Sequence, residues 1–285
     1  MKRQRILKLF LALFVTAGSL TFFNTTTLAR EKGLHRVSSS YINKIGLKSS
    51  YYRLNQNTKF SFSGEQVVLP KGTILSAVVS IDSGSKAKSG KALISTHVDI
   101  SYALKKRLGF SKPYRFIPIL LSYYPSRYTR VKRPAYVLPY GENILYAGGV
   151  KTFEKRAANY YDKPNFTGNA LKLTSDGYLE YYKYHKEPLA DGALHWQYVQ
   201  KPTSYVKIQH TLTKGSKTFL YYQTKLKGVK AAHLNKGKYH YRLSIKNQHT
   251  PYQYSGNVYA MWASLYMVSG ASYFTTPQND ANYGD

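Results

Sequence analysis

Residues 160–199 read YYDKPNFTGNALKLTSDGYLEYYKYHKEPLADGALHWQYV, and this stretch carries the strongest information about the fold. Short aromatic and aliphatic runs alternate in it with turn-forming groups such as Lys-Pro-Asn and Ser-Asp-Gly. This alternation is typical of short antiparallel strands joined by tight turns. Gly177, directly after Asp176, tolerates the positive φ that a hairpin turn requires. The stretch therefore predicts a mainly β fold.

The same order of features recurs further along the chain. Two pairs of glycines share a nine-residue spacing, namely Gly168 with Gly177 and Gly228 with Gly237. A tryptophan follows each pair, at Trp196 and at Trp262. A looser copy at 51–81 has a shorter glycine spacing and no tryptophan. The recurrence predicts two or three related small β modules.

This arrangement resembles the bacterial SH3 domain family, through ANYYDKP at 158–164, the two glycines that follow it and WQYV at 196–199. The resemblance implies small β-barrels with a shallow aromatic ligand groove. Its implied groove residues are Tyr160, Tyr161, Trp196 and Tyr198 in the middle module, and Tyr221, Tyr222, Trp262 and Tyr266 in the last. Core packing is the alternative for both tryptophans and for the first tyrosine of each pair. The composition is also similar to that of the tyrosine- and lysine-rich extracellular proteins of lactobacilli.

The chain divides on these grounds into a leader, a spacer, three modules and a tail. Residues 1–29 combine a basic start, a mostly apolar run of fifteen residues and Thr-Leu-Ala before Arg30, which predicts a cleaved secretory signal peptide. An uncleaved anchor is the alternative. The expected remaining parts are a polar spacer at 30–50, a first β-rich module at 51–150, SH3-like modules at 151–208 and 217–276, and a frayed tail at 277–285.

The first module departs from the template, because it contains a helical pattern. Apolar residues at 98–108 follow helical spacing, Thr96 is a candidate N-cap, and Gly109 suits a left-handed C-terminal cap. We expect an α+β insertion here, or a separate small α+β domain. Residues 151–159 fit a short helix and an entry strand equally well.

Composition narrows the range of functions. The chain has 42 Lys and Arg against 13 Asp and Glu, a formal net charge of +29, which favours a polyanionic partner. It has no cysteine, which excludes disulfides, thiolate metal sites and cysteine nucleophiles. Its 29 tyrosines suit thin β structures and recognition surfaces, because each ring has an apolar body and a polar tip.

Catalytic patterns are weak throughout. Ser-x-x-Lys occurs twice at 83–88, but in a Gly- and Ser-rich loop without the partner motifs of penicillin-binding enzymes. His97 and Asp99 have no further ligand at metal-binding spacing, and no pair of carboxylates is singled out for glycoside hydrolysis. We therefore expect no catalytic residues, no metal and no cofactor. A wall hydrolase hidden in 81–146 is the residual alternative.

Basic residues, in contrast, interleave with tyrosines. The candidate polyanion-binding residues are Arg127, Arg130, Lys132, Arg133, Lys236, Lys238 and Arg242. Because export argues against intracellular nucleic acid, the expected partner is an anionic cell-wall polymer or peptidoglycan, with no membrane contact after signal cleavage. The sequence predicts a secreted, non-catalytic cell-envelope protein. The alternatives are an outward-facing adhesin for host glycans, a self-assembling surface protein, or charge that serves solubility alone.

Overall fold

The computed structural model has a mainly β architecture, with 48% strand and 12% helix, which confirms the mainly β character of the predicted fold class. The predicted signal peptide lies outside the residues whose structure is described. Those residues are 32–45, 50–62, 65–77, 93–98, 100–113, 117–122, 126–140, 143–158, 168–185, 200–235, 237–256 and 259–279.

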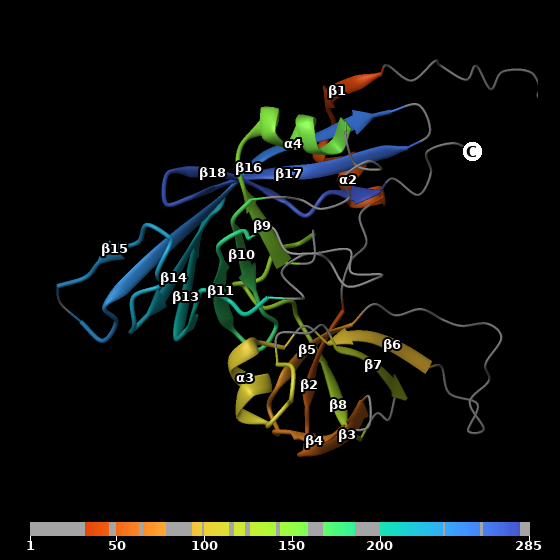
Figure 1. The fold of residues 1–285 in the computed structure, drawn as a ribbon, viewed down its shortest axis with the longest axis vertical. Coiled ribbons are helices and arrows are strands. Elements are labelled where there is room, and N and C mark those ends of the chain that lie inside the picture. Colours follow the sequence, from red (N-terminus) through yellow and green to blue (C-terminus); the bar gives the residue numbers. More distant parts are fainter. Residues whose placement is uncertain are drawn as a thin grey trace, which may run out of the picture. The chain divides into compact units, whose positions relative to one another are not determined.

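A first β region follows the N-terminal segment (Figure 1). Its strands are β2 (Ser50–Leu54), β3 (Thr58–Phe62), β4 (Glu65–Leu69), β5 (Ile74–Ala77), β6 (Leu93–Val98), β7 (Ile117–Ser122) and β8 (Tyr128–Val131). Strands β5, β2 and β8 form one antiparallel sheet, while β3 pairs with β4 and β6 pairs with β7. Buried residues of β2, β4, β5 and β8, including Leu54, Leu69 and Leu75, form one cluster.

The predicted helix at 98–108 is present as α3 (Tyr102–Arg107), although its N-cap is Ser101 and not Thr96. The side chain of Ser101 accepts a hydrogen bond from the amide of Leu104 at 3.1 Å, which is the usual N-cap interaction. Thr96 lies in strand β6 instead. After the helix, Gly109 adopts a φ of 80°, as a left-handed end requires. Ile100 and Leu104 pack into the core of the first β region.

One large antiparallel sheet contains all the other described strands. Along the sheet the order is β12-β11-β10-β9-β18-β17-β16-β14-β13, with β1 and β15 paired to β16 and β19 paired to β17. The bounds are β1 (Gly33–Arg36), β9 (Ile144–Ala147), β10 (Ala170–Leu173), β11 (Tyr178–Tyr182), β12 (Ser204–Lys207), β13 (His210–Lys214), β14 (Lys217–Tyr222), β15 (Ala232–His233), β16 (Tyr241–Ser255), β17 (Ala260–Val268), β18 (Ala271–Thr275) and β19 (Gln278–Asn279).

Strand β16 is the longest strand of this sheet. It spans 15 residues, pairs with β14 through its first half and with β1 through its second half, and contacts β17 on its other side (Figure 1). The register with β17 shifts between Asn247 and Pro251, a segment in which His249 adopts a φ of 52°. Proline is typically found at such irregularities, because it cannot donate a ladder hydrogen bond. Two parts of the sheet that lie far apart in the sequence are thereby joined.

The hairpin predicted at Asp176–Gly177 is confirmed. Strands β10 and β11 pair in register around it, and Gly177 has a φ of 83° and donates its amide to the carbonyl of Thr174 at 2.9 Å. Gly228, from the second glycine pair, lies against the ring of Tyr181 on β11, where a Cβ atom would collide with the ring. Gly228 of the second pair thus packs against the strand that follows Gly177 of the first pair.

The structure does not divide into the separate modules expected at 151–208 and 217–276. Strands from both ranges belong to one sheet, and β9, from before the first range, pairs with β10 and with β18. The described strands form no closed barrel. Period-two patterns specify that a segment is a strand, but strand pairing depends on long-range contacts that repeat spacing does not reveal.

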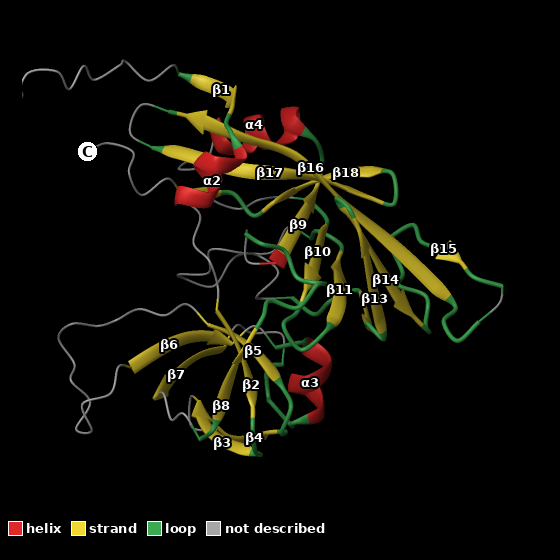
Figure 2. Cartoon of the chain, turned by 180° about the vertical axis from the view of Figure 1, so that it is seen from behind, coloured by secondary structure: helices red, strands yellow, loops and turns green. Residues whose placement is uncertain are grey.

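Three further segments differ from their sequence predictions. The expected spacer at 30–50 contains β1, which pairs with β16, and helix α2 (Ser39–Ile45). The expected frayed tail begins with β19, which pairs with β17. The ambiguous segment at 151–159 is helix α4 (Val150–Ala158), which packs against β16, β17 and β1 (Figure 2).

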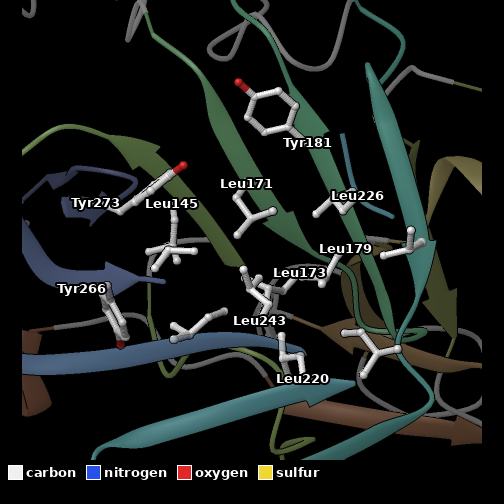
Figure 3. Packing of buried hydrophobic residues seen from close by; sticks show 14 of the residues in the cluster. Leu145, Leu171, Leu173, Leu179, Tyr181, Leu220, Leu226, Leu243, Tyr266 and Tyr273 are labelled. Atoms are coloured by element: carbon white, nitrogen blue, oxygen red, sulfur yellow. The ribbon is translucent and has the colours of Figure 1, made fainter. Parts of the chain in front are cut away.

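The large sheet has buried clusters on both sides. One cluster contains Leu171, Leu179, Leu220 and Leu243, whose side chains converge in Figure 3. The other includes Phe153 of α4 together with buried residues of β9, β10, β17 and β18. The inner side is defined here as the side that bears the cluster with Leu220 and Leu243.

Two carboxylates of the β10–β11 hairpin connect the sheet to the first β region. Asp176 accepts hydrogen bonds from the amide of Ser101 at 2.8 Å and from its hydroxyl at 2.7 Å. Glu180, which is 1% exposed, accepts from the amide of Tyr102 and, at 2.7 Å, from the hydroxyl of Tyr182. Negative charge is favourable at a helix N-terminus, so these contacts stabilise the start of α3.

Candidate binding face

The residues predicted for an aromatic groove do not come together as a group. Tyr160, Tyr161, Trp196 and Tyr198 lie outside the described residues. Tyr222, Trp262 and Tyr266 are buried, at 0%, 1% and 4% exposure. Buried rings cannot line an open groove, and for Trp262 the burial agrees with the alternative of core packing. Burial raises the pKa values of Tyr222 and Tyr266 above their ordinary range.

Tyr221 lies on the opposite side of β14 from Tyr222 and is only partly buried. In β14 the even-numbered Leu220 and Tyr222 point into the inner cluster, so the odd-numbered residues point away from it. Neighbouring β13 and β16 extend this outer side, since residues paired directly across antiparallel strands share a face. Tyr221 is the one predicted groove residue that is described and partly exposed.

The outer side of β13, β14 and β16 forms three rows of side chains, and we call it the basic–aromatic face. Each row crosses the three strands through directly paired residues. The aromatic row is His210–Tyr221–Arg242. The middle row is Leu212–Phe219–Ser244. The lysine row is Lys214–Lys217–Lys246. Leu212 is 37% exposed, which is among the largest exposures of an apolar side chain in the described residues.

The aromatic row continues into the loop before β16. The ring of Tyr239 stacks on His210 with centroids 5.7 Å apart and planes 2° from parallel. Tyr239 also contacts Tyr221, with a centroid distance of 5.6 Å, and His210 and Tyr221 are 5.5 Å apart. Three rings thus form one cluster at the edge of the face, and such clusters offer flat apolar surfaces to ring-shaped ligands.

Cations surround the aromatic rings of the face. The guanidinium carbon of Arg242 lies 5.2 Å from the ring centroid of Phe219, and Nζ of Lys217 lies 5.7 Å from it. Nζ of Lys238 lies 5.8 Å from the ring of Tyr239. These distances are within the range of cation–π attraction. Among the predicted polyanion-binding residues, Lys238 and Arg242 therefore belong to this face or its edge, while Lys236 lies outside the described residues.

The remaining predicted basic residues form a different surface. Arg127, Arg130, Lys132 and Arg133 are exposed on β8 and the segments beside it. Arg133 donates to the carbonyl of Val137 at 2.5 Å. Together these four residues supply positive charge to this part of the surface.

The sequence around the basic–aromatic face is free of acidic residues. Residues 192–279 contain 11 Lys and Arg and no Asp or Glu. Strands β13, β14, β15 and β16 all lie within this range. A surface of one charge sign raises the local concentration of counter-charged ligands, so this part of the molecule is suited to polyanions.

The described residues offer little for catalysis. Within them, no three His, Asp or Glu side chains gather so as to hold a metal ion. Asp176 and Glu180 are engaged with the start of α3, as described above. The Ser-x-x-Lys loop and Asp99 lie outside the described residues, and His97 is in β6. In the same described part of the chain, every helix is too short or too polar to cross a membrane.

Comparison of the chain with protein-family models, with curated proteins and with solved structures gave no match.

Sequence reasoning missed much of the face. It did not identify His210, Phe219, Tyr239 or the lysine row. A signal was present, because HTLTK at 210–214 and KTFLYY at 217–222 flank Gly-Ser, a hairpin turn sequence. Alternation within that hairpin would have placed Tyr221 and Tyr222 on opposite sides, with His210 on the side of Tyr221.

Proposed function

We propose that this protein is a secreted, non-catalytic component of the cell envelope, which binds anionic wall polymers or peptidoglycan. The observation that carries the proposal is the basic–aromatic face, where half-exposed rings and cations share one sheet surface in an acid-free part of the chain. Cations attract phosphates, and aromatic rings stack on sugar rings. The predicted signal peptide supports export to the place where such polymers occur.

The resemblance to bacterial SH3 domains belongs to this proposal. The β10–β11 hairpin and the repeated glycine pairs support it, since both glycine pairs adopt positive φ. In this proposal the repeats are SH3-like elements that have merged into one sheet, and the α3 segment is the α+β insertion. The ligand surface then lies on the outer side of β13, β14 and β16 and not in a groove lined by Trp262.

The direct test is a pull-down of residues 30–285 on purified Gram-positive cell walls, with and without their teichoic acids, across a salt series. We expect binding that weakens steeply with salt, because charge interactions are screened beyond ~10 Å at 0.1 M. Loss of binding on removal of teichoic acid identifies the anionic polymer as ligand. Binding unchanged by removal and by salt identifies peptidoglycan and the aromatic rings.

No binding under any condition would contradict the proposal and favour the outward-facing adhesin. Zymography of the same protein on wall preparations tests the absence of catalysis. A cleared band would contradict the binding-only function and direct attention to residues 81–146.

A further inference from the structure

The lysine row is an unfavourable arrangement for the isolated protein. Lys214 pairs directly with Lys217, and Lys217 pairs directly with Lys246, so three like charges lie side by side across adjacent strands. Like charges directly opposite each other destabilise a sheet. Lys217 relieves part of this cost by leaning over Phe219, while Lys214 and Lys246 are exposed. A ligand with several negative charges would replace this repulsion among the lysines by attraction between the lysines and the ligand.

The lysine row and the aromatic row stand at a fixed separation. They are four residues apart along each strand, which corresponds to about 14 Å at the usual rise of a β-strand. Between them lies the middle row, with Leu212 and Phe219. The face therefore offers charge at one edge and flat rings at the other, with an apolar strip between the two edges.

We propose that this face binds a phosphodiester polymer whose repeating units carry sugar rings, with phosphates on the lysine row and a sugar on the aromatic cluster. This inference rests on the proposed function and specifies the chemical class of its ligand. Lysine ammonium groups bind phosphate as point charges and tolerate a flexible chain. The cluster of His210, Tyr221 and Tyr239 supplies the flat apolar surface against which a sugar ring packs.

The phosphates and the sugar rings of the ligand are both needed to account for the two rows of the face. A neutral glycan would leave the three lysines with their mutual repulsion, and an unsubstituted polyphosphate would leave the ring cluster unused. Single-stranded nucleic acid also combines phosphates with stacking rings. The predicted export of the chain favours the sugar-bearing polymer, and nucleic acid enters the test as a competing outcome.

The experiment measures the dissociation constant of residues 30–285 for three probes between 50 and 200 mM salt. The probes are poly(glycerol phosphate) bearing hexose substituents, the same polymer without substituents, and single-stranded DNA of equal charge. We expect the hexose-bearing polymer to bind about tenfold more tightly than the bare polymer, at each salt concentration. Tighter binding of DNA, or equal binding of the two polymers, would overturn the inference.

Two sets of variants separate the charge from the rings. The triple variant Lys214→Gln, Lys217→Gln, Lys246→Gln is expected to reduce the slope of log K against log salt by about 2, at roughly 0.7 for each phosphate contact. The matched control, Lys225→Gln, Lys227→Gln, Lys230→Gln, removes the same charge from an exposed loop and is expected to change the slope much less. Equal changes in the two triple variants would contradict a phosphate site at the lysine row.

The double variant Tyr221→Leu, Tyr239→Leu is expected to lose about tenfold in affinity for the hexose-bearing polymer, with the salt slope unchanged. Tyr221→Phe with Tyr239→Phe keeps both rings and is expected to retain binding, which distinguishes loss of stacking from misfolding. Unaltered affinity in the leucine variant would overturn the inference. If the wild-type protein bound none of the probes and no wall preparation, the proposed function itself would fail, which is a distinct result.

Discussion

Tyr221 and Tyr222 are adjacent in the sequence but lie on opposite sides of the large sheet. The ring of Tyr222 is fully buried among inner-side residues such as Leu220 and Leu243. The ring of Tyr221 contacts His210 and Tyr239 on the basic–aromatic face. Tyrosine therefore occurs in two settings within β14, as a buried core residue and as a partly exposed surface residue. The inner side contributes to the stability of the fold, and the outer side is available for a ligand.

Charge follows the same division. Along β16, Leu243 and Ile245 are buried, while Arg242, Ser244 and Lys246 point outward. The alternation of a strand with period two separates the two sets without any change in overall composition. A high content of tyrosine and lysine consequently does not by itself indicate which residues bind a ligand. Substitutions on the two sides should affect different measurements.

The largest effect on stability is expected for truncation of an inner-side leucine. Leu220→Ala should lower the free energy of unfolding by about 2–5 kcal/mol, because it removes buried methyl groups and leaves a cavity. The matched control is Leu212→Ala on the outer side, where an exposed residue should change stability by about 0.5 kcal/mol or less. Urea denaturation measures both. Similar losses in the two variants would contradict the division between the sides.

The same contrast applies to charges. Glu180→Gln keeps the shape of a buried side chain but removes the negative charge that accepts the amide of Tyr102 at the start of α3. We expect a loss of about 1–3 kcal/mol, since hydrogen bonds to charged groups are the stronger ones. The control Lys246→Gln removes an exposed charge of the lysine row. Its stability should stay unchanged or rise slightly, as repulsion within the row decreases.

Should Glu180→Gln leave both the melting temperature and the protection of the α3 amides unaltered, the carboxylate would not stabilise this connection. Hydrogen exchange of the α3 amides is the more specific measurement, because it reports on the helix itself.

Local features of this fold could be predicted from the sequence. The Asp176–Gly177 hairpin, the helix ended by Gly109 and the mainly β character depend on residues close together in the chain, and each is confirmed. The partners of the strands could not be predicted. The pairing of β1 with β16 joins residues more than two hundred positions apart, and no local pattern specifies such a contact. For this reason the sequence did not reveal that strands from 151–208 and 217–276 belong to one sheet.

The candidate face was predictable only in part. Lys238 and Arg242 were identified because basic residues interleave with tyrosines around them, and Tyr221 through the resemblance to bacterial SH3 domains. The same resemblance gave Tyr222, Trp262 and Tyr266, which are buried, because the side to which a strand residue points depends on register and not on composition. His210 and Phe219 were missed, since their importance comes from cross-strand neighbours that the sequence does not show.

A third expected effect concerns pH. Burial, with a further contribution from the charge of Asp176, raises the pKa of Tyr136 to about 12, from an ordinary value of 10.0. Its hydroxyl donates to the carbonyl of Ser175 at 2.8 Å. Because the folded state favours the protonated phenol, this stabilisation is complete below pH 10 and is lost as the pH rises toward 12.

Unfolding free energies of the wild type and of Tyr136→Phe at pH 8 to 12 would measure this contribution. The variant should lose less stability than the wild type between pH 8 and pH 12. The difference in stability at pH 8 is subtracted first, because at that pH the wild-type Tyr136 is protonated and the variant has no phenol at this position. Parallel curves for the two proteins would show that Tyr136 does not titrate as proposed. A tyrosine packed on the inner side should therefore be recognisable because the ionisation of its hydroxyl is coupled to unfolding.

The smallest effect tests the hydroxyl of Tyr222 alone. This oxygen is buried and has no hydrogen-bond partner among the described residues. A buried polar group without a partner costs free energy, so Tyr222→Phe should leave stability unchanged or raise it by less than about 1 kcal/mol. Tyr221→Phe, on the outer side, should be neutral in the same urea titration. A loss greater than 1 kcal/mol in Tyr222→Phe would mean that the hydroxyl has a partner in the folded protein, and that the inner side of β14 is less purely apolar than its neighbours Leu220 and Leu243 indicate.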